Sequence, residues 1–241
     1  MPTIRYSLCA HSRELRERKS VAVDVKFCGL TRPADARLGA SLGARFLGVV
    51  FADSRRRVDT VRARAIFRPL AELRDPPSRV GVFGAASTLE ILATATQVGL
   101  DVIQLHADPK PSDVSALRES FGGEIWAARR IEGDQLPDDL DEIASVVDRV
   151  LLDARLEKGA PLGGGGRSFA WEAVADQLKH RSMPRLVVAG GLTPENVGAA
   201  IELLTPSVVD VSSGVEQSVG IKDEALMRAF VRAVGEGAIT R

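Results

Sequence analysis

Apolar, β-branched segments alternate with segments of helical periodicity from residue 23 onward, about every 25 to 30 residues. We expect the apolar segments to form eight strands, over residues 23–28, 46–51, 79–83, 102–105, 125–129, 149–152, 186–189 and 208–211. Eight strands that are each followed by a helix predict an α/β fold of one domain, the (β/α)8 or TIM barrel. A doubly wound open sheet is the alternative, although such sheets seldom need eight regular units.

Several predicted helices have recognisable ends. Ser87 and Glu90 have the spacing of a capping box, in which each side chain satisfies a free backbone N–H of the other residue. Residues 193–195 place a threonine cap, a proline and an acid in the order that favours a helix start. Thr31 is expected to cap the helix after the first strand, and the last helix is predicted over residues 223–234.

The barrel domain is predicted to cover residues 23–241, because no linker rich in Pro, Gly or Ser divides that stretch. The glycine run at 163–166 falls between the sixth strand and its helix, so we predict a mobile loop there. Residues 1–22 are basic and lack the apolar segment of a secretory signal, while Glu14 and Glu17 count against an organellar transit peptide. We predict that they form a disordered N-terminal extension or precede the true start codon.

Composition and charge argue against some classes of binding partner. The 32 basic and 32 acidic residues cancel, so no global field predicts binding to nucleic acid or to a membrane surface. No apolar run approaches the ~20 residues of a membrane span. Two cysteines, Cys9 and Cys28, do not make a disulfide framework, which favours a cytoplasmic setting. Monomer and homodimer both remain open.

Cys28 and Asp153 are the candidate acid–base groups. Cys28 ends the first strand on the same face as Lys26, which would place its thiol at the rim of a barrel. Asp153 closes an apolar strand, and it must lie near the mouth because a lone buried carboxylate is costly. The alternatives are a cysteine that is only a small buried hydrophobe and an aspartate that only caps its loop. Lys26 could lower the pKa of Cys28 or instead neutralise Asp210.

Two glycine-containing turns predict an anion site. Gly190 and Gly191 follow the seventh strand, while Ser213 and Gly214 follow the eighth. Glycines let backbone N–H groups approach a ligand, and a short helix after the eighth strand would direct its positive end at a phosphate. Phosphate sites recur at this place in such barrels. Either pair alone could be a tight turn, but both together predict a phosphorylated ligand.

Other polar residues carry weaker signals. The arginine run at 55–57 is either a solvated face or a clamp for an anionic group of the substrate. His106 shares a strand face with Gln104, and structural hydrogen bonds are the simpler role for it. Trp126 and Trp171 are expected to pack either in the core or beneath a loop. The sequence contains no dinucleotide fingerprint, no P-loop and no clustered metal-ligand spacing, so we expect neither cofactor nor metal.

With these motifs in order, the chain resembles the phosphoribosylanthranilate isomerases of tryptophan biosynthesis. The resemblance runs from about residue 23 to residue 235, and its most specific parts are the cysteine motif and the motif after the eighth strand. The stretches that carry it are 26–31, 48–51, 54–58, 81–83, 104–106, 151–153, 169–171, 189–197 and 210–216.

The resemblance implies an Amadori rearrangement of N-(5-phosphoribosyl)anthranilate to the carboxyphenylamino deoxyribulose phosphate, with no metal or cofactor. Asp153 would protonate the ribose ring oxygen, and Cys28 would then remove the C2′ proton. Arg56, His106 and Asp210 would contact the substrate. The phosphate would lie against backbone N–H groups of four residues, Gly190, Gly191, Ser213 and Gly214.

Some positions depart from the family pattern. The loop after the second strand is about one residue shorter than usual, so Arg55 or Arg57 could replace Arg56. Ala107 stands where a glycine normally follows the histidine, and Ala170 replaces a common aspartate. None of these changes removes the acid or the base, so we expect them to affect catalytic efficiency and loop geometry more than the class of reaction.

Three rival functions remain. The related histidine-pathway isomerase has an aspartate at the position of Cys28, which argues against that family. A thiamin phosphate synthase-like barrel shares the phosphate loop but needs a metal site for a diphosphate. A non-catalytic relative that binds a phosphorylated metabolite is disfavoured by the retention of Cys28 and Asp153.

Overall fold

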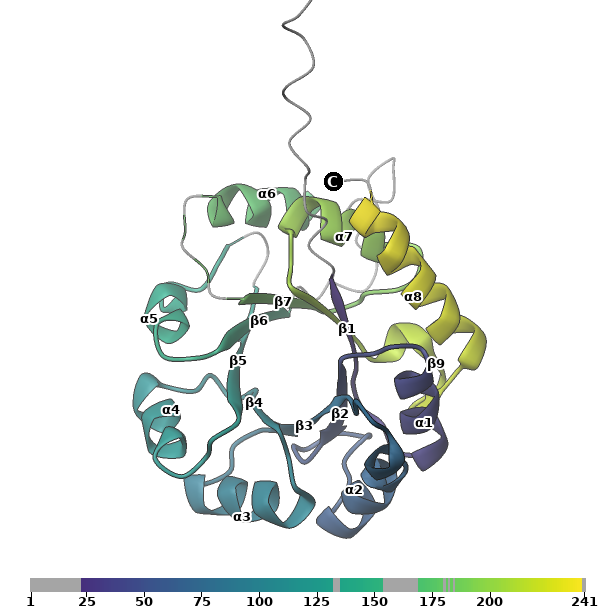
Figure 1. Cartoon of the computed structure of the whole chain (residues 1–241). Coiled ribbons are helices and arrows are strands. Elements are labelled where there is room, and N and C mark those ends of the chain that lie inside the picture. The colour runs from purple at the N-terminus through teal and green to yellow at the C-terminus, as the bar shows by residue number, and fades with distance from the viewer. Residues whose placement is uncertain are drawn as a thin grey trace, which may run out of the picture.

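The protein is described by a computed structural model over residues 23–131, 135–153, 169–179, 181, 183 and 185–239. Within these ranges eight parallel strands close into a barrel in sequence order, and helices surround them (Figure 1). The predicted (β/α)8 barrel is therefore confirmed. The expectations for residues 1–22 and for the glycine run at 163–166 lie outside the described residues.

The predicted strands agree with the observed ones to within one residue at each end. The observed strands are β1 (Asp24–Phe27), β2 (Phe46–Val50), β3 (Ser78–Phe83), β4 (Val102–Leu105), β5 (Glu124–Arg130), β6 (Arg149–Asp153), β7 (Arg185–Ala189) and β8 (Val208–Val211). After β8 come the single 3₁₀ turn η2 (Ser213–Val215) and a hairpin of β9 (Glu216–Ser218) and β10 (Ile221–Lys222).

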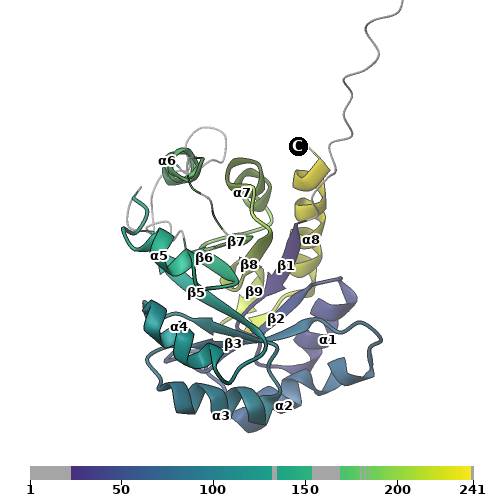
Figure 2. The same cartoon turned by 60° about the vertical axis from the view of Figure 1, so that its left-hand side comes forward.

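Helices cover the outside of the barrel, and α7 lies beside α8 next to β8 and β1 (Figure 2). Their bounds are α1 (Pro33–Ser41), α2 (Thr60–Phe67), α3 (Thr88–Val98), α4 (Pro111–Arg118), α5 (Leu140–Ala144), α6 (Phe169–Leu178), α7 (Val197–Leu204) and α8 (Glu224–Ile239), with a 3₁₀ segment η1 (Arg68–Glu72) after α2. In the described part of the chain no helix has the length and apolar character needed to cross a membrane.

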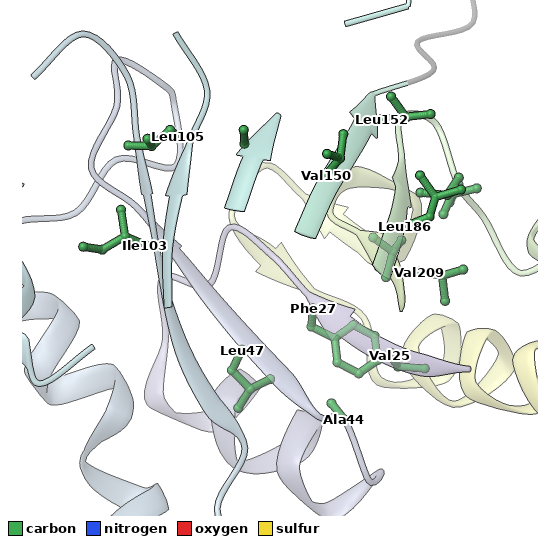
Figure 3. Close-up of a cluster of buried hydrophobic side chains, with 14 of the residues drawn as sticks. Val25, Phe27, Ala44, Leu47, Ile103, Leu105, Val150, Leu152, Leu186 and Val209 are labelled. Carbon is green, nitrogen blue, oxygen red and sulfur yellow. The ribbon is translucent and has the colours of Figure 1, made fainter. Parts of the chain in front are cut away.

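The first and last strands close the barrel. β1 pairs in parallel with both β2 and β8, and Lys26 stands opposite Asp210 in the register with β8. Since side chains alternate along a strand, Val25 and Phe27 point outward into the layer between sheet and helices (Figure 3). Lys26 therefore points into the barrel, as Cys28 does one pleat further on.

Aromatic and charged side chains fill the end of the barrel where the strands begin. The rings of Phe46 and Trp126 meet edge to face at 4.8 Å, and the Arg149 guanidinium lies 5.2 Å and 5.4 Å from their centroids. Glu124 accepts hydrogen bonds from Arg149 Nε (2.9 Å) and from the Trp126 indole N–H (2.7 Å). Trp126 and Trp171 are 0% and 1% exposed, which confirms both as core residues. This packing fills the interior of the barrel at that end.

The capping box at the start of α3 is confirmed, whereas the role predicted for Thr31 is wrong. Ser87 and Glu90 make both reciprocal hydrogen bonds. At α1 the N-cap residue is Arg32, and no side chain caps the helix. The Thr31 hydroxyl instead donates to the carbonyl of Gly220, between β9 and β10. Thr31 therefore tethers the hairpin, which no local pattern around residue 31 indicates.

Two other helix ends differ from the predictions. The helix predicted from residues 193–195 begins at Val197, because the Thr193 N–H donates to the Asn196 side chain (2.8 Å) and closes a turn first. The last helix runs to Ile239, five residues beyond the predicted end. Both differences lie at element ends, where fraying and local turns compete with the helix.

Candidate active site

A cavity of about 350 Å³ opens at the carboxyl ends of the strands. Its walls come from β1, β2, β3, β4, β6, β7 and β8 and from the loops that follow them. Among the residues that line it are eight predicted site residues: Cys28, Arg56, His106, Asp153, Gly190, Gly191, Asp210 and Ser213. The structure thus brings together residues that are up to 185 positions apart in the sequence, from 28 to 213.

Cys28 and Asp153 face this cavity from β1 and β6, with β7 and β8 between them. Cys28 is a free, partly exposed thiol. Burial raises its pKa; Asp210 adds to this effect, while Lys26 opposes it. The thiol is therefore mostly protonated at neutral pH in the unliganded site. Asp153, at the end of its strand, is also partly exposed.

A buried ion pair lies beneath the thiol. Lys26 Nζ is 2.6 Å from Asp210 Oδ2, and the two side chains are 0% and 7% exposed. Burial alone would lower the pKa of Lys26, but Asp210, and to a smaller extent Cys28, outweigh it and raise the pKa. Lys26 therefore fills both roles considered for it: it neutralises Asp210, and its charge acts to lower the pKa of Cys28, although burial outweighs that effect. Gly48 makes room for the pair, since a Cβ there would lie 3.3 Å from Lys26 Cε.

Two buried acceptors at this level have no hydrogen-bond partner among the described residues, Asp210 Oδ1 and Gln104 Oε1. Both residues line the cavity. Because an unpaired buried acceptor costs roughly 1–3 kcal/mol, these oxygens suit a ligand that brings hydroxyl or N–H donors.

His106 is held with a neutral ring. Burial lowers its pKa, and the positive charge of Lys26 adds to that shift, against the opposing effect of Asp153. Its backbone N–H donates to the Phe83 carbonyl (2.8 Å), which fixes the loop after β4 to β3. The ring is thus suited to neutral hydrogen bonding rather than to pairing with an anion.

The loops after β7 and β8 depend on glycine. Gly190 and Gly191 have φ values of 92° and 67°, in the left-handed region that other residues disfavour. Gly214, the one predicted site residue that does not line the cavity, packs so closely on the β7 loop that a methyl group would collide with the Leu192 carbonyl oxygen. The predicted short helix after β8 is the single turn η2, which begins at Ser213.

Arg56 is the arginine of the run at 55–57 that lines the cavity. Arg55 and Arg57 are exposed, and neither is among the described residues around the cavity. The Arg56 side chain passes over Gly29 (φ 71°), where a Cβ would lie 2.5 Å from Arg56 Cδ. This glycine therefore lets the arginine lie against the backbone that follows Cys28.

Comparisons with known proteins agree on one family. A family profile described as N-(5′-phosphoribosyl)anthranilate (PRA) isomerase matches residues 25–233. The chain belongs to the phosphoribosylanthranilate isomerase family. The Pseudomonas aeruginosa N-(5′-phosphoribosyl)anthranilate isomerase is 43% identical over 216 residues, which cover 88% of this chain and 95% of that protein. This family, rather than the histidine-pathway isomerases, is therefore the one to which the sequence motifs belong.

Solved structures of phosphoribosylanthranilate isomerases share the fold. The Thermotoga maritima isomerase superposes with a TM-score of 0.77 and 31% identity, covering 89% of this chain and 99% of that one. Another, with a TM-score of 0.75, 30% identity and the same coverage, was solved in complex with reduced 1-(o-carboxyphenylamino)-1-deoxyribulose 5-phosphate.

Two residues beside this cavity, Glu216 and Lys222, were not among the predicted site residues. Glu216 accepts two hydrogen bonds from Arg56, at 2.7 Å and 2.6 Å, and is 3.0 Å from Lys222 Nζ. Burial would raise the pKa of Glu216, but Arg56 and Lys222 outweigh it and lower the pKa. Glu216 belongs to the motif at 210–216, but its partner lies 160 residues away, so the sequence offers no local signal for the contact.

Proposed function

We propose that this chain catalyses the reaction for which its family is named, the Amadori rearrangement of N-(5-phosphoribosyl)anthranilate to 1-(2-carboxyphenylamino)-1-deoxyribulose 5-phosphate, in tryptophan biosynthesis. The observation that carries the proposal is a thiol and a carboxyl group on separate strands that face one cavity beside two glycine loops. The complex of the relative with a reduced carboxyphenylamino deoxyribulose phosphate supports the same assignment.

In the proposed first step, Asp153 acts as the general acid and donates a proton to the ribose ring oxygen. The bond between that oxygen and C1′ breaks, and the lone pair of the anilino nitrogen forms an iminium ion. As the iminium forms, the Cys28 thiol loses its own proton to solvent. The thiolate then removes the proton from C2′, and the electron pair of that C–H bond neutralises the iminium to give an enolamine. Tautomerisation of the enolamine yields the ketone, so the product has the atoms of the substrate and no cofactor is required.

The raised pKa of Cys28 fits this order of events. In the unliganded site the thiol is a weak base, because Lys26 offsets the effect of burial on its pKa only in part. Ring opening creates a cation on the substrate, and a cation within a few ångströms favours the thiolate. Proton donation by Asp153 thus prepares the base for the second step.

The rest of the cavity is proposed to hold the two anionic ends of the substrate. Backbone N–H groups around Gly190, Gly191, Ser213 and Gly214 would bind the phosphate. Arg56 would bind the anthranilate carboxylate. The unpaired oxygen of Asp210 and the neutral ring of His106 would contact the ribose hydroxyl groups, which can donate and accept hydrogen bonds.

The test is a fluorescence assay with phosphoribosylanthranilate generated in situ. Loss of anthranilate-type fluorescence faster than spontaneous hydrolysis, with the product mass unchanged from the substrate, is the expected result. Cys28→Ala and Asp153→Ala should each lower kcat by at least ~10²-fold, the usual contribution of a positioned acid or base. Asp75→Asn, at a side chain that is 92% exposed, is the matched control. A folded wild-type protein that binds the product but gives no turnover would instead support the non-catalytic binding barrel.

We also propose that residues 1–22 are an extension and that the barrel alone carries the activity, as a monomer or homodimer in the cytoplasm. The family match begins at residue 25, which supports this division. A chain that begins at Val23 should keep the kcat and KM of the full chain. A loss of activity with the fold retained would give the extension a role in the reaction, and light scattering of both chains would measure the oligomeric state.

A further inference from the structure

Three charged side chains meet at the edge of the cavity, from the loop after β2 and from the β9–β10 hairpin. Glu216 accepts two parallel hydrogen bonds, from Nε and Nη2 of Arg56. Lys222 Nζ donates to Glu216 at 3.0 Å and to the Ser212 carbonyl at 2.9 Å. The side chains of Glu216 and Lys222 are 4% and 0% exposed, whereas Arg56 is 20% exposed toward the cavity.

We propose that Glu216 is a positioning residue, which fixes the Arg56 guanidinium so that its remaining donors face the carboxylate of the substrate, and that Lys222 holds Glu216 in place. This inference rests on the proposed function. It assigns to the hairpin the recognition of the aryl carboxylate, at a distance from the acid and the base.

The donor geometry of arginine supports this division of labour. A guanidinium carries five N–H bonds in one plane. Glu216 uses the Nε–H and one N–H of Nη2, so three N–H bonds remain, and two of them lie on the edge formed by Nη1 and Nη2. That edge can bind a second carboxylate through two parallel hydrogen bonds. Arg56 can therefore serve both partners, which a lysine at this position could not do.

The surroundings restrict the arginine to this arrangement. Its stem lies on Gly29, directly after Cys28. The hairpin is tethered from its other side, where Thr31 donates to the Gly220 carbonyl and Arg32 donates to the Lys222 carbonyl (3.2 Å). Two adjacent residues after β1 thus hold the hairpin that carries Lys222 and Glu216.

Charge also favours an anionic ligand here. Two cations surround one carboxylate, which leaves one net positive charge beside the cavity. In addition, Glu216 comes directly after η2, the turn that begins at Ser213 in the proposed phosphate site. The same short segment therefore aligns both anionic ends of the substrate relative to each other.

The test compares two ligands in Glu216→Gln and in wild type. The probes are reduced carboxyphenylamino deoxyribulose phosphate and its phenyl analogue without the carboxylate. Because hydrogen bonds to charged groups are worth roughly 1.5–3 kcal/mol, we expect Glu216→Gln to weaken binding of the carboxylated probe about 10-fold or more. Binding of the phenyl probe should change by less than about 2-fold, and KM should rise far more than kcat.

Controls separate positioning from folding. Glu224→Gln removes a carboxylate that pairs with an arginine at 2.7 Å on the exposed face of α8, so it should change neither probe. Glu216→Asp, which keeps the charge, should restore part of the discrimination between the probes. If Glu216→Gln fails to fold, Lys222→Met is the second variant to test. It leaves the Arg56–Glu216 pair intact, so it should lower the discrimination between the two probes by a smaller factor.

Two results would overturn the inference. One is an equal loss of affinity for both probes, which would make Glu216 a support for the phosphate loop alone. The other is unchanged discrimination in a folded Glu216→Gln variant whose wild-type parent turns over phosphoribosylanthranilate. If the wild type neither turns over this substrate nor binds either probe, the proposed function itself fails, and the inference falls with it.

Discussion

Lys26→Met should strongly destabilise the barrel. Lys26 is 0% exposed and pairs at 2.6 Å with Asp210, which is 7% exposed. The substitution keeps a side chain of similar length but leaves the Asp210 carboxylate inside the barrel without its cation. One oxygen of that carboxylate already lacks a partner among the described residues, so the variant would leave both unpaired.

The expected loss follows from the burial of the pair. Removing one partner of a buried ion pair typically costs about 3–5 kcal/mol. In a domain of this size each kcal/mol lowers Tm by about 2–4 °C, so Lys26→Met should lower Tm by about 6–20 °C. Lys179 pairs with Asp176 at the same distance, 2.6 Å, but the two side chains are 67% and 73% exposed. Lys179→Met should therefore cost about 1 kcal/mol or less.

Urea unfolding followed by tryptophan fluorescence is the assay, because Trp126 and Trp171 are both buried. Lys26→Met with Asp210→Asn in the same chain removes both charges and should recover much of the loss, since a buried pair replaced as a whole is often close to neutral. The reasoning would be refuted by a loss below about 1 kcal/mol in Lys26→Met, or by a double variant whose loss is the sum of the two single losses.

Three further outcomes follow from the site. Burial raises the pKa of Cys28 in the unliganded enzyme, so kcat/KM should rise with pH and keep rising above about 8.5, the ordinary thiol value. A kcat/KM profile that is flat from pH 6 to 9 would exclude the thiolate as the base. Gly214→Ala should raise KM by about 10-fold, because the added methyl group clashes with a backbone carbonyl. Gly198→Ala, at a glycine with open space around it, should leave KM unchanged. If the two variants had the same KM, the loop at Gly214 would have no role in binding the phosphate. Arg56→Ala should raise KM by about 10-fold or more, whereas Arg57→Ala should leave KM unchanged. If Arg57→Ala raised KM and Arg56→Ala did not, Arg57 would be the residue that binds the carboxylate of the substrate.

Most of the fold could be predicted from the sequence, because strands and turns have local sequence signals. Apolar runs bounded by turns predict all eight strands, and the Ser87–Glu90 capping box is a pattern of four residues. Cys28 and Asp153 could be found because each ends a strand, and the ends of parallel strands meet at one face of a barrel. Position along a strand is thus enough to bring a residue to the mouth.

What the sequence could not provide are contacts between distant loops. The pairing of Arg56 with Glu216 and that of Thr31 with Gly220 depend on how the β9–β10 hairpin folds back, which no periodicity encodes. The pairing of Lys26 with Asp210 also could not be established from the sequence, because it depends on the register of β1 with β8. In each case the missing information is a three-dimensional distance rather than a residue type.

The pairing of β1 with β8 has a consequence for synthesis of the chain. Lys26 is made 184 residues before Asp210, an interval of roughly 10 to 40 s at common translation rates. Until β8 leaves the ribosome, Lys26 has no carboxylate with which to enter the barrel, and the edges of β1 and β7 stay open to other chains. A chain that is released before β8 has neither closed barrel nor cavity. Only a chain that has been translated through β8 can therefore be active. Prematurely terminated chains cannot close the barrel and stay exposed to aggregation and proteolysis.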